Sequence, residues 1–525
     1  MPLRSRGRAI AVAAGLLLVA CRPTAIAPRG GDEAPAAADA SPASGTLEAA
    51  IARHLADAGF GPPAADDDFA LLRRASLDLL GRIPTAAELD AYRGADPRTR
   101  YDAAIDRMLA DPEHAAFLAS TWTDVLLAQA LKDRPAIEQG TAAWLTTAFA
   151  SDRGFDDVTR EILVAQGEFT AEGPAGFLAS FGRKGRTAAL AGETARIFLG
   201  TQIQCAQCHD HPDAAYTQRE FHAFAAHFAR TQVRPVKGDD GLAVRVSERA
   251  RGQGRLPRPE DPPDEPTGEI VLPRYFGTPT TAGDHRREAL ATAILGDRRF
   301  ARAIANRTWA QLLGAGVIEP VDALPVDGAV PPLLDALTDS FIAGNHRLDT
   351  LIGAIVRSSA YRAAGRGDGD GAARVAAFAQ ARVRPLPSTA LLGSLGVAAG
   401  LAAGERPQGL PGARAALREF RFAFDDDEGA AADQGPSLPQ ALLLQHGVLD
   451  EAAARPRGDT VLAHVLREYD DTDARIEALW WRLFTHAPDD EERALARSAV
   501  ERGGPEAWSD LVHAMLVSSE FTTNH

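Results

Sequence analysis

The sequence predicts a mainly α protein: stacked helical hairpins in two helical domains, with a small Pro/Gly-rich, β-containing segment between them. Apolar residues recur with helical spacing over most of residues 47–230 and again over residues 284–525. Prolines and glycines interrupt this spacing over residues 231–283. With 525 residues, 45% of them hydrophobic, the chain has ample material for the core of each domain.

Residues 1–20 are typical of a lipoprotein signal peptide. A basic start precedes the apolar run Ala9 to Ala20, which is too short for a bilayer that needs ~20 residues. The run ends in Leu18-Val19-Ala20-Cys21, which resembles a bacterial lipobox. We therefore expect lipid on Cys21 and a membrane anchor without a spanning helix. The alternative is a plain secretory signal that happens to end near a cysteine.

Residues 21–46 are rich in Ala, Pro, Gly and Ser and predict a flexible tether behind the lipidated cysteine. A lipoprotein of this kind lies outside the cytoplasm, in the bacterial cell envelope. Arg22 follows the cysteine where an aspartate would signal retention at the inner membrane, so the outer membrane is favoured. The formal net charge of −15 argues against nucleic acid as a partner.

The first helical domain, residues 47–230, contains recognisable helix starts. Thr85 to Glu88 and Thr217 to Glu220 are both capping boxes, in which the threonine and glutamate satisfy each other's amides. Asp111 followed by proline predicts a third start.

In the connecting segment, residues 231–283, two short runs have strand character, Leu242 to Val246 and Glu269 to Leu272. We expect these runs to pair as a small hairpin or sheet. We also expect no appreciable β structure outside this segment.

The second helical domain, residues 284–525, contains an echo of the first. Leu77 to Glu88 resembles Trp481 to Glu492, and Met108 to Glu113 resembles Met515 to Glu520. The similarity can come from an internal duplication. It can also arise without one, because unrelated helical hairpins use the same residues at helix starts and ends, so both explanations stay open. Either one favours stacked hairpins over a sheet protein.

The motif Cys205-Ala206-Gln207-Cys208-His209 carries the most specific chemistry in the chain. CxxCH is the sequence to which haem c is attached through two thioethers, with the histidine as an iron ligand. Two alternatives remain at the same residues. Cys205 and Cys208 can form a structural disulfide with no cofactor. They can also hold zinc together with His209 and His211.

A haem would need a second axial ligand or an open site. The candidates for a second axial or metal ligand are the following residues: His211, His222, His227 and Met108, with His114 and Met515 as further imidazole and thioether groups. Phe221, Phe224 and Phe228 are candidates to line an apolar slot for the porphyrin.

Taken together, these motifs resemble the planctomycete-type cytochrome c domain proteins. Those are secreted bacterial proteins in which two domains of unknown function, DUF1549 and DUF1553, are paired. The resemblance is carried in the first part by Asp67 to Glu88, Phe198 to Pro212, Thr217-Gln218 and Pro273 to Tyr275, and in the second part by Arg299 to Trp309, Gly314 to Asp322, Ile355 to Tyr361 and Ser437 to Leu442. The family name rests on the CxxCH and on frequent fusion to recognisable cytochrome domains, so the haem, disulfide and zinc alternatives at this motif all stay open.

Two functions from different classes follow. The first is a membrane-tethered c-type haem protein that passes electrons to a redox partner outside the cytoplasm. The second is a cofactor-free lipoprotein whose helical surface binds a partner or an extracellular polymer. The sequence contains no nucleophile elbow, phosphate loop or HExxH motif, so no enzymatic activity is assigned.

Overall fold

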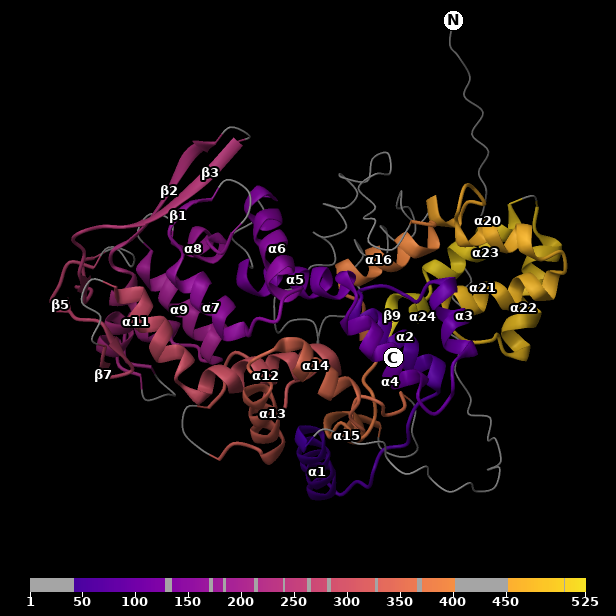
Figure 1. Ribbon diagram of the computed structural model, residues 1–525, viewed down its shortest axis with the longest axis horizontal. Helices are drawn as coiled ribbons and strands as arrows, with labels where there is room; N and C mark the ends of the chain where they lie inside the picture. Colours follow the sequence, from indigo (N-terminus) through magenta and orange to yellow (C-terminus); the bar gives the residue numbers. More distant parts are fainter. Residues whose placement is uncertain are drawn as a thin grey trace, which may run out of the picture. The chain divides into compact units, whose positions relative to one another are not determined.

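The computed structural model describes most of the chain from residue 42 onward (Figure 1). The signal peptide, Cys21 and most of the tether lie outside the described residues, which belong to a unit starting at Ser41. The structure describes these ranges: 42–127, 135–169, 173–182, 186–211, 216–238, 241–261, 266–280, 285–325, 329–365, 371–401, 452–504 and 506–525.

Helices dominate the described residues and confirm the mainly α prediction. The N-terminal helices are α1 (Pro42–Asp57), α2 (Asp68–Leu79), α3 (Ala86–Gly94), α4 (Arg100–Leu109), α5 (Pro112–Leu127), α6 (Pro135–Phe149), α7 (Phe155–Val164), α8 (Gly176–Phe181), α9 (Thr187–Leu199) and α10 (Gln218–Ala225), with the short 3-10 helices η2 (Gln204–Gln207) and η3 (Ala226–Phe228). The C-terminal helices are α11 (Arg286–Leu295), α12 (Arg298–Leu313), α13 (Pro332–Ala343), α14 (Leu348–Val356), α15 (Gly371–Ala376), α16 (Ser388–Ala398), α20 (Val461–Glu468), α21 (Thr472–Leu483), α22 (Asp490–Arg502), α23 (Ala507–Leu516) and α24 (Ser519–Thr522).

The predicted helix starts are present. Thr85 and Thr217 each accept from the backbone N–H three residues on, and the glutamate at that position reaches back to the cap. The Asp111 carboxylate accepts from the N–H of Glu113 at 2.8 Å. These interactions span no more than three residues, which is why the sequence alone predicts them.

The connecting segment holds most of the β structure, but with a different pairing from the one expected. Strand β3 (Gly241–Glu248) lies between β2 (Thr231–Gly238) and β1 (Gly167–Phe169) in an antiparallel sheet of order β1-β3-β2. Strand β5 (Ile270–Val271) pairs instead with β4 (Gly254–Arg255). The prediction that Leu242–Val246 and Glu269–Leu272 pair with each other is therefore wrong.

The reason for this error is the chain's local connectivity. Two residues separate the end of β2 from the start of β3, so these two strands form a hairpin with a very short loop. Pro235 and the charged residues of β2 obscure its strand pattern in the sequence. The remaining strands are the pair β6 (Arg274–Tyr275) and β7 (Thr278–Pro279), and the pair β8 (Arg384–Pro385) and β9 (Thr523–Asn524). β1, β8 and β9 lie outside residues 231–283 but have only three, two and two residues, so the longer strands among the described residues lie within that segment, as expected.

The main hydrophobic core is shared between the two sequence halves. It includes Trp122 and Phe155 from the first half and Phe300 from the second. The Trp122 and Phe155 rings lie 4.3 Å apart, and Phe155 stacks on Phe300 with centroids 6.4 Å apart. Helices α9 and α12 also pack together across the connecting segment. A second cluster is built mainly from α16 and α20–α23, to which Leu77 and Ile83 also contribute.

The internal echo is accompanied by matching local interactions. Helices α2 and α21 both begin with an aspartate cap, Asp67 and Asp471. Helix α22 begins with a capping box between Asp489 and Glu492, as α3 does at Thr85. The two segments therefore start their helices in the same way.

In both similar segments a residue with positive φ follows the first helix, which is α2 in one and α21 in the other. Gly81 has φ +66° and Thr485 has φ +70°. One residue later, Arg82 forms an ion pair with Glu113 at 2.7 Å, and His486 forms one with Glu520. Glu113 lies on α5 and Glu520 lies on α24. In each of the two similar segments, the ion pair therefore connects the residue after the positive φ to a later helix.

Candidate functional site

The CxxCH motif lies on a turn that follows helix α9. Gly200 ends α9 in the left-handed conformation, with φ +59°, and a Cβ atom there would lie 2.9 Å from a methyl group of Leu324. The chain then forms η2, which contains Cys205. Cys205 and Cys208 are both exposed and their thiols are free. The structural disulfide is thus not formed in this structure.

The N-terminus of helix α10 holds this turn in place. The Gln218 side-chain amide donates to the main-chain oxygen of Cys208 at 2.8 Å and to that of Gln207 at 3.3 Å. The Gln218 backbone N–H donates to Asp210 Oδ1 at 2.8 Å. Residues on both sides of His209 are therefore tied to α10.

His222, on helix α10, contacts the turn through its side chain. Its side chain is only 5% exposed, and its Nε2 lies 3.0 Å from the main-chain oxygen of Gln207, between the two cysteines. Burial lowers the pKa of His222, and the hydrogen bond to Gln207 opposes that shift. The imidazole is therefore a neutral donor to the turn. This contact occupies Nε2 and the ring is buried, so His222 supports the motif and only its Nδ1 is left for any ligand.

His209 is exposed and has a defined orientation. Its Nδ1 lies 2.7 Å from the main-chain oxygen of Asp210. A carbonyl only accepts, so Nδ1 carries a proton and Nε2 is the nitrogen left for a ligand. Among the described residues Nε2 has no hydrogen-bond partner. This is the arrangement that a metal-ligating histidine requires.

His211 faces a cluster of polar and aromatic residues. Its backbone N–H donates to the carbonyl oxygen of Tyr216 at 2.8 Å, and its ring meets the Tyr216 ring edge to face at 6.4 Å. Behind Tyr216, Tyr275 donates to Asp297 Oδ2 at 2.7 Å. Arg299 pairs with Asp297 at 2.6 Å, and this cluster links the CxxCH region to helix α12.

His227 is fully buried and both of its ring nitrogens are engaged. Nδ1 lies 2.8 Å from the Phe224 carbonyl oxygen, and Nε2 lies 2.8 Å from Thr280 Oγ1. Burial lowers the pKa of His227 to about 4. The structure therefore places His227 in the core, where it does not offer a nitrogen to a ligand.

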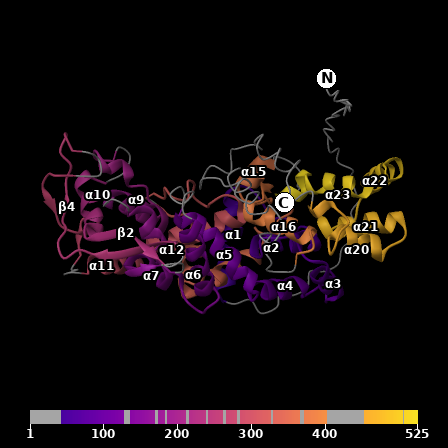
Figure 2. The same ribbon diagram turned by 90° about the horizontal axis from the view of Figure 1, so that it is seen from above.

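The remaining candidates are not brought to the motif. Met108 lies on α4, which packs against α2, α5 and α14, and Figure 2 shows α4 well away from α10. His114 is buried with Nδ1 2.9 Å from the Leu79 carbonyl oxygen. Met515 belongs to the second hydrophobic cluster. Their places in separate parts of the core follow from long-range packing that the sequence does not reveal.

The apolar slot expected beside the motif is also filled by packing. Phe221, Phe224 and Phe228 are at most 2% exposed and belong to the main core. They form the buried face of α10 and η3. Their side chains pack these two elements against the main core and do not line an open slot.

Two wider findings concern metals and membranes. Within the described residues, no group of three or more His, Cys, Asp or Glu side chains is arranged to hold a metal ion. The zinc set of Cys205, Cys208, His209 and His211 is thus not gathered. None of the described helices combines the length and the apolar character needed to cross a membrane.

The donor set fits the attachment of haem c. Two free, exposed thiols lie three positions apart, and the following histidine presents Nε2. Sequence reasoning missed the residues that position them, Asp210 and Gln218. Two signals were available: the Thr217 capping box, which places Gln218 in the first turn of α10, and the presence of Asp210 and Gln218 in stretches that carry the family resemblance.

Comparisons with known proteins agree with the resemblance. Residues 46–233 match the family model PSCyt2, described as a protein of unknown function (DUF1549). Residues 286–412 match PSD1, described as a protein of unknown function (DUF1553). No curated protein and no solved structure matches the chain. The chain therefore belongs to the family of proteins in which a DUF1549 domain is followed by a DUF1553 domain.

Proposed function

We propose that this protein is a lipid-anchored, extracytoplasmic c-type haem protein that transfers electrons. The observation that carries the proposal is the arrangement at the CxxCH. Cys205 and Cys208 are free and exposed, and His209 presents Nε2 while Asp210 holds its Nδ1–H. These are the groups that haem attachment uses, and Nε2 is the histidine nitrogen left for the iron.

The residues of the turn have distinct roles in this proposal. Each thiol of Cys205 and Cys208 would add its S–H across one vinyl group, forming a thioether without net oxidation. His209 would hold the iron through Nε2 and keep its Nδ1–H on the Asp210 carbonyl. When bound, the haem supplies a reversible one-electron couple.

The contacts of the candidate residues limit which of them could be the second ligand of the iron. His227 engages both ring nitrogens, and His222 is buried under the turn with its Nε2 bound to the Gln207 oxygen. Met108 lies on α4, away from the motif. His211 follows His209 by two residues, so the chain itself keeps it beside the motif. The Cα atoms of residues two apart lie at most ~7 Å from each other, too close for His209 and His211 to bind one iron from opposite sides, so we propose that none of these four residues is the second ligand.

The anchoring part of the proposal rests on the sequence. Cys21 would carry the lipid, and the tether up to residue 46 would link it to the helical body. The lipobox and Arg22 favour the outer membrane. A redox partner would then meet the CxxCH outside the cytoplasm, where the exposed turn offers a short path for electrons.

The experiment is expression of the full chain together with a cytochrome c maturation system. The wild type should gain the mass of one haem, keep it through acid-acetone extraction, and give a pyridine haemochrome spectrum. Cys205→Ala/Cys208→Ala should be colourless. His464→Ala, a change at an exposed histidine, is the matched control and should bind haem like the wild type. Colourless wild-type protein with two alkylatable thiols would overturn the proposal.

A second candidate is favoured by the buried phenylalanines, because the described residues beside the motif form no open apolar slot. In this alternative Cys205 and Cys208 close into a structural disulfide and the surface binds a partner. Oxidised protein would then be colourless and lighter by two mass units than the reduced form. A zinc protein would also be colourless, but it would lose metal to a chelator.

A further inference from the structure

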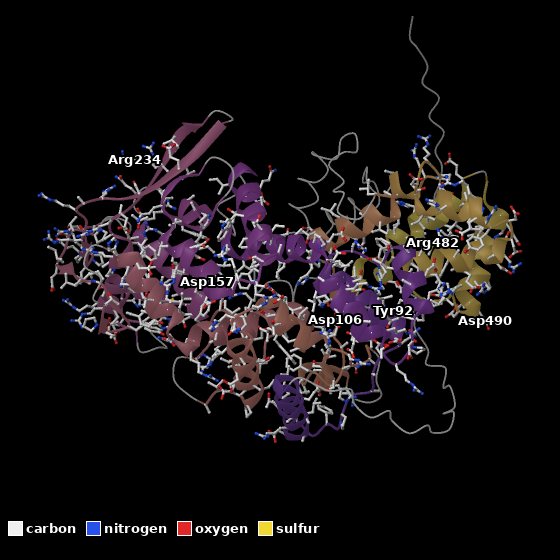
Figure 3. The ribbon with its side chains drawn as sticks, viewed as in Figure 1. Tyr92, Asp106, Asp157, Arg234, Arg482 and Asp490 are labelled. Atoms are coloured by element: carbon white, nitrogen blue, oxygen red, sulfur yellow. The ribbon has the colours of Figure 1, made fainter. Side chains whose placement is uncertain are left out.

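The outer face of the three-stranded sheet gathers arginines. In the register of β2 and β3, Arg234 lies opposite Arg245, and Gln232 lies opposite Ser247. Arg249 follows β3 with the same alternation. Arg234, Arg245 and Arg249 are all exposed. Figure 3 shows Arg234 on this sheet at the surface of the molecule. We call Gln232, Arg234, Arg245, Ser247 and Arg249 the arginine face.

The opposite face of the same sheet packs on the body. Val244 and Val246 are 4% and 1% exposed, and Val233 packs against the main core. The sheet also contacts helix α8. Because side chains alternate strictly along a strand, burial of these valines fixes the arginines on the solvent side.

Two of these arginines share one neutral acceptor. With the Gln232 amide oriented so that its oxygen faces them, that oxygen accepts from Arg249 Nε at 2.7 Å and from Arg234 Nη2 at 3.0 Å. Neither Arg234 nor Arg249 has a carboxylate partner among the described residues. Arg245 forms an ion pair with Glu168 of β1. The face therefore carries two uncompensated positive charges that are already oriented.

This arrangement works against the stability of the sheet. Like charges directly opposite each other on antiparallel strands repel. Arg234 and Arg245 occupy such a pair in a chain whose formal net charge is −15. Departures from such local rules are expected at functional sites. At physiological salt the field of the distant acidic residues is screened within ~8 Å, so the local positive charge dominates here.

We propose that the arginine face binds an acidic polysaccharide through its carboxylate or sulfate groups. Guanidinium groups match both anions with paired hydrogen bonds. Arg245 and Arg249 are four residues apart, or ~13 Å along an extended strand. One small anion can lie between Arg234 and Arg249, which share the Gln232 oxygen, but it cannot also reach Arg245, whereas charges repeated along a polymer can. Gln232 and Ser247 lie between the arginines and supply neutral hydrogen bonds for sugar hydroxyls.

The other polyanions fit less well. The face has no aromatic side chain on which a base would stack, which disfavours single-stranded nucleic acid. By register its apolar residues are Val236 and Ala243, which lie opposite each other, and this is too little to insert into a lipid surface. The proposal goes beyond electron transfer and does not depend on haem attachment.

The test measures binding of the folded chain, without its signal peptide and Cys21, to dextran sulfate and polygalacturonate, with neutral dextran as the reference polymer. The variant is Arg234→Gln/Arg249→Gln. The matched control is Arg98→Gln/Arg502→Gln, which makes the same change in net charge at two other exposed arginines. Circular dichroism checks that all three proteins fold.

We expect the wild type and the control to bind both acidic polymers, with binding weakened by salt. The Arg234→Gln/Arg249→Gln variant should lose at least about tenfold in affinity, since each lost charged hydrogen-bond pair costs about that factor. Equal binding by the variant, or none by the wild type, would overturn the proposal. It would also be overturned if vesicles of phosphatidylglycerol or oligo(dT) bound through the same arginines more tightly than the polysaccharides.

Discussion

His222 Nε2 lies 3.0 Å from the main-chain oxygen of Gln207. Gln207 is the residue between Ala206 and Cys208, so this hydrogen bond joins a buried helix side chain to the middle of the CxxCH turn. The Gln218 amide reaches the same oxygen from the start of the helix. Helix α10 thereby fixes the turn at two points, while the cysteines and His209 stay exposed.

Replacing His222 tests this support. His222→Ala removes a buried ring and a donor, so we expect a loss of about 2–3 kcal/mol in the free energy of unfolding. His222→Gln keeps a donor and should recover part of that loss. Urea denaturation of the haem-free protein measures both. Equal losses in the two variants would mean that the hydrogen bond to Gln207 contributes nothing.

The pH dependence of stability should contain a contribution from His227. Burial lowers its pKa in the folded protein to about 4, from an ordinary value of 6.5. Its contribution is therefore fully present above pH 6.5 and is lost as the pH falls toward 4. Between pH 7 and pH 4.5 we expect the wild type to lose about 2.5 kcal/mol more than His227→Gln. Denaturation curves at both pH values check this, and parallel losses would contradict it.

Asp78 should be among the costliest carboxylates to remove. Its side chain is 6% exposed and pairs with Arg384 at 2.5 Å. It also accepts from the Tyr361 hydroxyl at 2.8 Å and from Asn524 Nδ2 at 2.9 Å. Asp78→Ala leaves the arginine without its charge partner, and we expect a loss of about 3–5 kcal/mol.

The control for Asp78 is Asp90→Ala. Asp90 is 75% exposed and lies 3.4 Å from Arg93, so its removal should cost less than about 0.5 kcal/mol. Chemical denaturation of the two variants gives the comparison. Similar values would show that the network around Asp78 adds nothing beyond a surface ion pair.

Lipidation of Cys21 is checked in cells. An alkynyl fatty acid should label the wild type and leave Cys21→Ser unlabelled and unprocessed, because the lipobox cysteine provides the thiol that is acylated. Cys205→Ala/Cys208→Ala retains Cys21 and should be labelled normally. Equal labelling of the wild type and Cys21→Ser would exclude the lipid anchor at this position.

The sequence by itself determined the features that depend on near neighbours in the chain. The helical class and the capping boxes at Thr85 and Thr217 follow from contacts within three or four residues. The CxxCH and the motifs of the family resemblance are also short stretches of consecutive residues, so they can be recognised without the structure. The expected pairing of Leu242–Val246 with Glu269–Leu272 is wrong because β3 pairs with the neighbouring β2. The proline and the charged residues of β2 make that strand hard to recognise in the sequence.

Only the tertiary structure decided which side chains surround the motif. His222 and His227 lie five residues apart on the same segment, yet one supports the turn and the other is sealed against Thr280. The partners of Asp78 come from residues 283 to 446 positions away. Such contacts depend on how helices pack, and burial then sets which nitrogen is engaged and which pKa is lowered. No local pattern in the sequence encodes that packing.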